Sequence, residues 1–253
     1  MEILAGATFG LAALGYFLYR RKTDQDDDET TTIRSPLPSS SSDASPFSPA
    51  FFRVDLSQLA AVYHHNHGHI PFVKACILRL SQADALSTPG IFRESGSRQR
   101  VEELIVRFSQ PDCSSFEDIS AVLSNEEVKT VSSLLQYWLT EMPESFVSVE
   151  SYAALHQIAA GKTKFNQSAC TQEVLTWLGR LPEVSQYFFR EFLPLLSQIV
   201  AHSDVNRMTL HNLATVTSPL LLLCMNPATI LSETALNAKI FEVLISEWHH
   251  LSF

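Results

Sequence analysis

The stretch GIFRESGS, residues 90–97, places an arginine on a short segment between two glycines, and a helical pattern follows directly in RQRVEEL, residues 98–104. Gly90 and Gly96 permit backbone conformations that other residues resist, so we expect a tight loop here. Arg93 lies inside that loop, and its guanidinium presents a planar fork of N–H donors that can hold phosphate oxygens at two points. The stretch predicts an arginine held on a stiff loop for delivery into a partner's site. The alternative is a surface arginine on an ordinary turn.

The residues behind the loop predict a helix. Ser97 is a favourable N-cap, and Val101, Leu104 and Phe108 recur at helical spacing. The apolar pair directly before Arg93 requires a core, so it would hold the near end of the loop. We therefore expect the arginine to be mounted between a core contact and a capped helix.

The pattern GIFRxSGS resembles the arginine-finger loop of RhoGAP domains, the GTPase-activating modules for Rho-family small GTPases. Two further segments resemble the same family in the expected order: LLQYWLTEMPE, residues 134–144, and DVNRMTLHNLA, residues 204–214. The resemblance extends over about residues 52–250. It implies an all-α fold, a RhoGAP-like helical bundle.

The resemblance also implies catalysis in trans. A Rho-family small GTPase would hold GTP, Mg²⁺ and the attacking water, and Arg93 would enter that site as the catalytic residue. The chain has no GxxxxGK[ST] phosphate loop, so we expect it to have no cofactor of its own, with GTP and Mg²⁺ belonging to the partner. No nucleophile, base and orienting group form a recognisable set. The chain is therefore expected to be a GTPase activator and not itself an enzyme.

Five residues make up the partner-binding set that the resemblance implies. Asn212 falls where the family has an asparagine near the bound GTPase. Gln136 and Thr140 stand where the family commonly carries a lysine and an arginine that contact the GTPase. Glu141, beside them, and Arg100, behind the finger loop, complete the set.

The uncharged side chains at Gln136 and Thr140 are departures from the family pattern. If each lost charged contact contributed about 1.5–3 kcal/mol, the affinity for an acidic or phosphate-bearing partner would fall roughly a hundredfold or more. These departures favour an alternative function, a non-catalytic tether or effector that binds a small GTPase through a degenerate RhoGAP fold. The retained Arg93 and Asn212 favour the activator.

Composition excludes several other functions. The 253 residues carry a net charge of -9, which argues against a nucleic-acid partner. Four scattered cysteines without a CxxC pair indicate reduced thiols. Four histidines lie close together between residues 64 and 69, but no cysteine or carboxylate is close enough to complete a tetrahedron. We expect a solvated loop there and no metal.

Residues 3–19, ILAGATFGLAALGYFLY, form an uncharged run that would span about 26 Å as a helix. The basic group at residues 20–22 follows this run instead of preceding it, which does not suit a cleaved signal peptide. A buried core helix is the other alternative, but the disordered linker expected after it leaves it no core to join. We predict a membrane anchor over residues 1–22, single-pass, with the rest of the chain in the cytosol. A short span of this kind indicates the mitochondrial outer membrane or the endoplasmic reticulum more than the plasma membrane. Gly6 and Gly10 form a GxxxG step that suggests self-association through the anchor.

Residues 23–50 change to an acidic and then Ser/Pro-rich composition that offers little to bury, so a disordered linker is expected. The folded domain is predicted over residues 51–253. Its helices are expected to begin with one that opens at Pro71, and Ser124 with Glu127 is read as a capping box for the helix that Pro143 ends. Later helices are predicted over residues 149–160, 170–178 and 230–248, with a long one after residue 182 and no strand.

Overall fold

The computed structural model of the chain describes residues 51–66, 68–110, 112–160, 167–222 and 230–250. These residues belong to one compact unit, Ala50–Phe253. The predicted anchor at residues 1–22 and linker at residues 23–50 lie outside the described residues. Within the described ranges, no helix combines the length and apolarity needed to cross a membrane.

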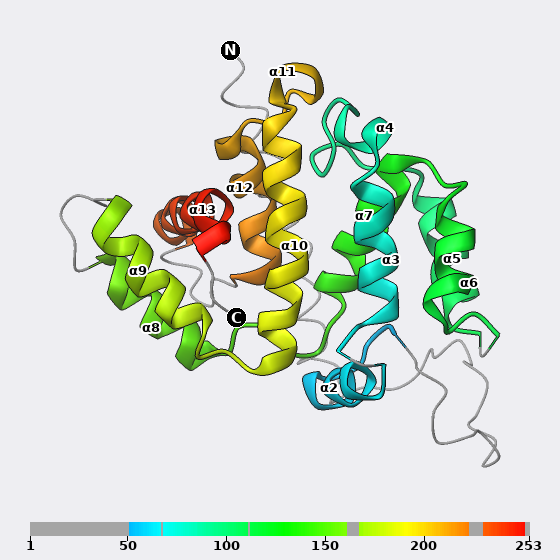
Figure 1. Ribbon diagram of the computed structural model, residues 1–253, viewed down its shortest axis with the longest axis horizontal. Coiled ribbons are helices and arrows are strands. Elements are labelled where there is room, and N and C mark those ends of the chain that lie inside the picture. The colour runs from blue at the N-terminus through cyan, green and yellow to red at the C-terminus, as the bar shows by residue number, and fades with distance from the viewer. Residues whose placement is uncertain (1–50, 67, 111, 161–166, 223–229, 251–253) are drawn as a thin grey trace, which may run out of the picture. The chain divides into compact units, whose positions relative to one another are not determined.

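Every regular element in the described residues is helical, so the predicted all-α fold is confirmed. The elements, coloured along the chain in Figure 1, are α2 Leu56–His65, α3 Pro71–Leu80, α4 Ala83–Leu86, α5 Arg98–Phe108, α6 Phe116–Leu123, α7 Val128–Thr140, α8 Val149–Ala160, α9 Gln167–Leu178, α10 Glu183–Ala201, α11 Ser203–Asn206, α12 Leu210–Leu221, α13 Ile230–Glu247 and the short 3₁₀ helix η1 Trp248–His250.

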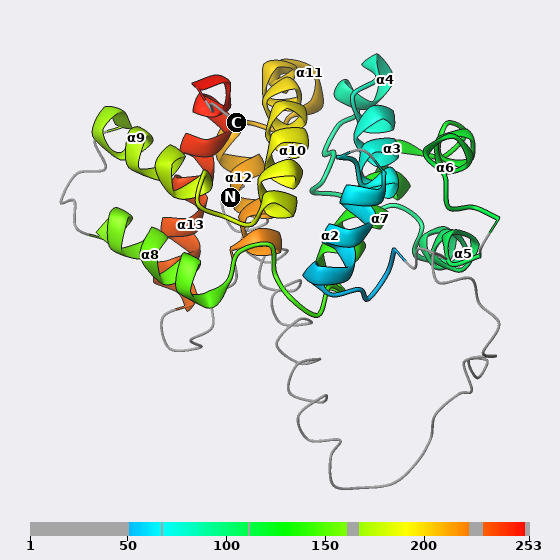
Figure 2. The same cartoon turned by 60° about the horizontal axis from the view of Figure 1, so that its bottom comes forward.

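Helix α10 runs through the middle of this domain. It contacts α2 and α3 on one side and α12 and α13 on the other. Helices α5 and α6 lie beyond α3 and α7, whereas α8 and α9 lie beyond α13, as both Figure 1 and Figure 2 show. The order of layers therefore places the loop before α5 next to α10 and α7.

An aromatic cluster forms the centre of the core. The rings of Phe146 and Phe188 stack with centroids 4.5 Å apart, and Trp138 lies 6.2 Å from Phe188. Phe192, one helical turn after Phe188, continues the cluster at 5.1 Å. Its other neighbour is Phe92, the residue directly before Arg93, at 5.9 Å. Phe92 and the fully buried Ile91 therefore join the core to residues 90–97, the loop that carries Arg93 and is called the finger loop below.

Several predicted helix boundaries are confirmed. Pro71 occupies the first turn of α3, where its missing N–H costs no helical hydrogen bond. The Ser97 hydroxyl accepts a hydrogen bond from the Arg100 backbone N–H and caps α5. The segment at residues 149–160 and the long helix after residue 182 are also helical, as predicted.

The predicted capping box of Ser124 and Glu127 is wrong. Ser124 ends α6, a helix that was not predicted, and its hydroxyl donates back to the Ala121 carbonyl. Glu127 is the N-cap residue of α7 but makes no side-chain capping hydrogen bond. Ser124 and Glu127 have the Ser-x-x-Glu spacing of a capping box, but Ser124 belongs to the end of one helix and Glu127 to the start of the next.

The predicted histidine loop is also only partly correct, because α2 includes His64 and His65. This helix begins with a true capping box, in which Asp55 accepts from the Gln58 backbone N–H and the Gln58 side chain accepts from the Asp55 backbone N–H. His67 lies outside the described residues.

Candidate functional site

The loop that carries Arg93 is fixed at its near end by backbone hydrogen bonds. The Gly90 carbonyl accepts from the backbone N–H of both Arg93, at 2.9 Å, and Glu94, at 2.8 Å. The Gly90 N–H donates in turn to the Asn206 carbonyl at 2.8 Å. Gly90 has a φ of +70°, a conformation that glycine adopts without steric cost. The Arg93 side chain is 38% exposed.

Phe92 has a φ of 65°, which is uncommon for a bulky residue. Such a conformation costs on the order of 1–3 kcal/mol and persists only where its surroundings hold it. Here the ring is 2% exposed and packs edge-on against Phe192 of α10. The buried ring therefore turns the backbone so that the next residue, Arg93, projects away from the core.

The far end of the loop lies against α7. A Cβ at Gly96 would come within 2.3 Å of the Thr130 backbone nitrogen, so only glycine allows this approach. The Gly96 N–H donates to the Ser133 hydroxyl at 2.9 Å, and the Ser97 N–H donates to the Thr130 hydroxyl at 3.4 Å. The loop is therefore held at one end by Asn206 and at the other by the first turns of α7.

Asn206 lies in the family-like segment of residues 204–214 but was not predicted to have a role in the site. It is fully buried, and its side-chain amide donates to the Leu86 carbonyl at 2.8 Å and the Ile199 carbonyl at 2.7 Å. Its side-chain oxygen accepts from the Met208 N–H at 2.7 Å. The buried Asn206 side chain therefore joins the end of α4, the end of α10 and the turn before α12, and its backbone carbonyl holds the finger loop at Gly90.

Two charged neighbours of Arg93 were also missed. The Glu94 carboxylate lies 3.7 Å from the Arg93 guanidinium and accepts a hydrogen bond of 2.6 Å from Lys129 Nζ. The Lys129 hydrogen bond, with help from both positive charges, holds the pKa of Glu94 below its usual range. The Glu94 carboxylate is therefore shared between two cations, Arg93 and Lys129.

Helix α7 presents one face to this loop. Lys129 and Ser133 hydrogen-bond to the loop. Gln136 and Thr140 follow them at spacings of three and four residues, so all four share one face of the helix. Gln136 and Thr140 are half-buried. The predicted partner-binding pair therefore continues the face on which the finger loop rests.

Asn212 lies in the first turn of α12, where its backbone N–H donates to the capping hydroxyl of Thr209 at 3.2 Å. Its side chain is half-buried. Because Asn206 binds the finger loop and precedes α12 by only a short turn, the start of α12 belongs to the same corner as Arg93.

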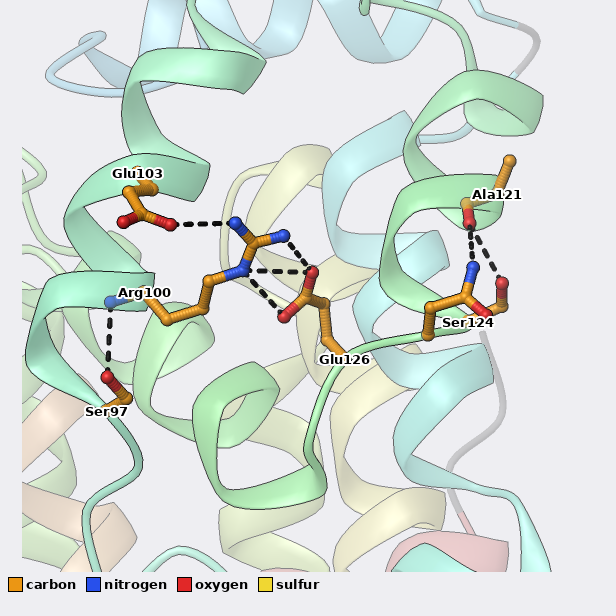
Figure 3. Close-up of polar contacts among 7 residues, drawn as sticks. Ser97, Arg100, Glu103, Ala121, Ser124 and Glu126 are labelled. Atoms are coloured by element: carbon orange, nitrogen blue, oxygen red, sulfur yellow. Dashed lines mark hydrogen bonds and ion pairs between the residues drawn. The ribbon is translucent and has the colours of Figure 1, made fainter.

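Arg100 is occupied within its own domain, as Figure 3 shows. Its guanidinium bonds the Glu126 carboxylate through Nη2 at 2.5 Å and Nε at 3.0 Å, and Glu103 through Nη1 at 2.8 Å. These two carboxylates, Glu126 first, raise the pKa of Arg100 above its usual range. Glu126 is only 9% exposed, whereas Arg100 is 46% exposed. The pair joins α5 to the connection between α6 and α7.

Glu141 is likewise occupied. Its carboxylate accepts from Arg53 Nε at 3.1 Å, and its side chain is 5% exposed. Among the described residues, one group of side chains has the spacing to hold a metal ion: Glu247, the last residue of α13, with His249 and His250 of η1. It does not include the histidines of the His64–His69 segment.

Known proteins resemble this chain over the same residues. The RhoGAP domain family matches residues 71–226. Rho GTPase-activating protein 22 of Mus musculus is 33% identical over 162 residues, which cover 63% of this chain and 22% of that protein. Rho GTPase-activating protein 24 of Homo sapiens is 30% identical over 177 residues, which cover 69% of this chain and 23% of that protein. The chain thus spans less than a quarter of the length of these curated relatives.

Solved structures share the fold. The crystal structure of the BH domain from GRAF, the GTPase regulator associated with focal adhesion kinase, has a TM-score of 0.61 and 22% identity, covering 71% of this chain and 92% of that one. Human Rho GTPase activating protein 15 has a TM-score of 0.63 and 22% identity, covering 77% of this chain and 90% of that one. With the family match over residues 71–226, this chain belongs to the RhoGAP domain family.

Proposed function

We propose that this chain is a GTPase activator and that Arg93 is the residue it inserts into the nucleotide site of a Rho-family small GTPase. The observation that supports the proposal is that the loop carrying Arg93 is fixed at both ends. The loop is fixed to Asn206 at one end and to α7 at the other, and the Arg93 guanidinium is 38% exposed. A guanidinium held in this way loses little further conformational freedom when it enters a partner's site.

The proposed chemistry belongs jointly to the two proteins. The partner GTPase holds GTP, Mg²⁺ and the attacking water, and this chain supplies no cofactor. As the terminal phosphoryl group transfers, negative charge develops on its oxygens and on the leaving oxygen, and the Arg93 guanidinium stabilises it. An arginine finger accelerates hydrolysis by about 10³–10⁵, which corresponds to roughly 4–7 kcal/mol of barrier. This chain therefore acts as a regulator of the partner's reaction.

The proposed contact surface surrounds the finger loop. Gln136 and Thr140 would contact the partner from the α7 face that carries the loop, and Asn212 from the first turn of α12. The exposed part of Arg100 can reach a partner while it stays paired with Glu126. Glu141 is 5% exposed, so its part in binding is restricted to holding α7 against Arg53.

Single-turnover GTP hydrolysis tests the proposal. The full chain in excess should accelerate hydrolysis by at least one member of a panel of GTP-loaded Rho-family GTPases, and Arg93→Ala should abolish the acceleration while binding persists. Arg180→Ala is a matched control, because Arg180 is exposed but lies in the turn before α10, and that helix separates it by about 28 Å from the corner that holds the finger loop. Equal hydrolysis rates with and without the chain would refute the activator.

One observation supports a second function. Gln136 and Thr140 leave α7 without the two cations that the family commonly has there, which suits a tether that binds a GTPase without accelerating hydrolysis. In that case the chain would bind GTP-loaded GTPase, the hydrolysis rate would not change, and Arg93→Ala would change neither quantity. The same experiment therefore separates the two functions.

We further propose that residues 3–19 anchor the chain in a membrane, with the domain in the cytosol, and that Gly6 and Gly10 let two anchors associate. The uncharged run and the basic group at residues 20–22 support this proposal. The short span favours the mitochondrial outer membrane or the endoplasmic reticulum. An anchor near a membrane-bound GTPase would raise the effective concentration of the domain and offset a weak contact surface.

A further inference from the structure

The residue next to the finger arginine carries the opposite charge. Glu94 follows Arg93 directly, and its Oε1 lies 3.7 Å from Arg93 Nη2. This placement is unfavourable for an arginine finger, because a carboxylate beside the guanidinium competes with phosphate for it. It would also repel the phosphates of GTP once the loop entered a nucleotide site.

Lys129 counters both effects in the structure. Its Nζ lies 2.6 Å from Glu94 Oε2, a hydrogen-bonding distance, whereas the contact of Arg93 with Glu94 is too long for a hydrogen bond. Lys129 is therefore the stronger partner of the carboxylate. The hydrogen bond from Lys129 is the main cause of the lowered pKa of Glu94, and the charge of Arg93 lowers that pKa to a smaller extent.

The position of Lys129 is fixed by the helix that supports the loop. It is the second residue of α7, in the same first turn as Thr130, which contacts Gly96 and Ser97. Its side chain is 25% exposed, and that of Glu94 is 49% exposed, so the pair lies at the surface that a docked partner would cover. Covering it would remove water and strengthen every charge interaction there.

Lys129 is also the single charged side chain of α7, whose sequence is VKTVSSLLQYWLT. Because Gln136 and Thr140 are uncharged, the net charge near the finger depends on Lys129. Arg93, Glu94 and Lys129 together carry a net charge of about +1 at neutral pH, and without Lys129 the net charge would be zero.

We propose that Lys129 is a positioning residue for Arg93, which acts by holding the Glu94 carboxylate away from the guanidinium and from the phosphates of a partner's GTP. The inference rests on the proposed activator function. Lys129 would thus supply α7 with a cation that acts through the finger loop. The lysine and arginine that the family commonly has on this helix are replaced here by Gln136 and Thr140.

The test is a double-mutant cycle in single-turnover GTP hydrolysis, with the full chain at saturating concentration over a GTP-loaded Rho-family GTPase. Lys129→Met should lower the saturating rate roughly fivefold, the effect of about 1 kcal/mol at 1.36 kcal/mol per decade. Glu94→Gln should exceed the wild-type rate, because the competing carboxylate is gone. In the Glu94→Gln background, Lys129→Met should then cause less than about a twofold further fall.

Two comparisons separate this role from a structural one. Lys239→Met, at an exposed lysine of α13, is the matched control and should leave the rate unchanged. The fall caused by Lys129→Met should shrink as ionic strength rises, because exposed charge pairs are screened by salt. Loss of fold would instead lower the thermal midpoint, and Glu94→Gln would not rescue it.

The possible results are distinct. If the wild type accelerates hydrolysis, Arg93→Ala abolishes it and Lys129→Met has the wild-type rate, this inference is wrong and the activator function stands. A double variant as slow as Lys129→Met would also overturn it, since the effect would not pass through Glu94. If the wild type itself does not accelerate hydrolysis, the proposed function fails and this inference fails with it.

Discussion

Single residues decide how Arg93 is presented. Gly90 and Phe92 turn the backbone through positive φ angles, and the buried Phe92 ring holds that turn against α10. Gly96 lets the far end of the loop touch the backbone of α7. Each of these residues acts through its backbone conformation or through close approach to a neighbour. Even a small change of side chain at these positions should therefore shift the position of Arg93.

Gly96→Ala should therefore be costly. The added methyl group would meet the backbone of Thr130 at 2.3 Å, and since backbone cannot rotate away, the loop must move off α7. We expect a loss of about 1–3 kcal/mol in the free energy of unfolding, measured in urea, together with slower stimulated GTP hydrolysis. Gly179→Ala is the matched control, because its nearest atom would be the Thr176 carbonyl oxygen at 3.6 Å. Equal stability of the two variants would contradict this account of the loop.

Restoring charge on α7 should strengthen the partner contact. The double change Gln136→Lys with Thr140→Arg should lower the dissociation constant for a GTP-loaded Rho-family GTPase roughly a hundredfold at low salt, with a smaller gain as salt rises. The affinity would be measured by titration calorimetry at several salt concentrations.

Gln172→Lys with Thr176→Arg provides the matched control for that change. It introduces the same residue types at the same spacing on exposed positions of α9. An equal gain from both double variants would indicate general charge attraction, and no gain from the α7 variant would place the contact elsewhere.

At the scale of elements, buried or half-buried ion pairs join the helices around the finger. Arg79 of α3 is 9% exposed and binds the Asp84 carboxylate at 3.0 Å as well as the Glu126 carbonyl at 3.1 Å. Glu126 in turn binds Arg100 of α5. These contacts link α3, α4 and α5 to the residue before the start of α7. They therefore fix the position of the helix turn that carries Lys129 and contacts the finger loop.

Asp84→Asn should destabilise the domain in a pH-dependent way. The Arg79 hydrogen bond holds the pKa of Asp84 below its ordinary value of 3.8, so the ionised form stabilises the fold. That stability is present above the unfolded pKa, near pH 4, and is lost as pH falls through the lower folded pKa. Because Asp84 is 61% exposed, solvent screening limits the effect to about 1–2 kcal/mol at neutral pH.

Urea unfolding of both proteins between pH 7 and pH 3 measures this difference. The difference in the free energy of unfolding between wild type and Asp84→Asn should be largest at pH 7 and should narrow towards pH 3. Asp112→Asn is the control, since Asp112 pairs with an Arg107 side chain that is itself 43% exposed, and less than about 0.5 kcal/mol is expected. A gap that does not narrow in acid would show that charge is not the cause.

At the scale of the whole molecule, the domain is arranged around α10, and its aromatic cluster passes from Phe146 through Phe188 and Phe192 to Phe92. The rigidity of the finger loop thus depends on the same core that stabilises the domain. Ile91 and Phe92 are buried in this core, whereas the next residue, Arg93, has a side chain that is 38% exposed.

The proposed anchor makes a prediction for residues 1–22. Deletion of residues 2–22 should move the protein from the membrane fraction to the soluble fraction of cells, because the uncharged run is the segment expected to partition into lipid. Fractionation followed by alkaline extraction measures this. Replacement of the same residues by an unrelated spanning segment should restore membrane association, and a deletion variant that stays in the membrane fraction would contradict the proposal.

The sequence alone determined the features that depend on short spacing. The helical class, the capped start of α5, the opening of α3 at Pro71 and the loop around Arg93 all follow from residues within a turn or two of one another. The helices α2 and α6 were missed although Asp55 and Ser115 cap them, because neither was read as a cap. Their local signals were present in the sequence.

Only the tertiary structure decided which side chains surround the finger. Lys129 and Glu94 are 35 residues apart, Arg100 and Glu126 are 26 apart, and Arg53 and Glu141 are 88 apart. Helical periodicity predicts the face on which a residue lies, but the partner across that face depends on how the helices pack. The sequence therefore determined that Arg93 stands on a loop, and the packing of that loop against α7 and α10 determined the charges and contacts that hold it there.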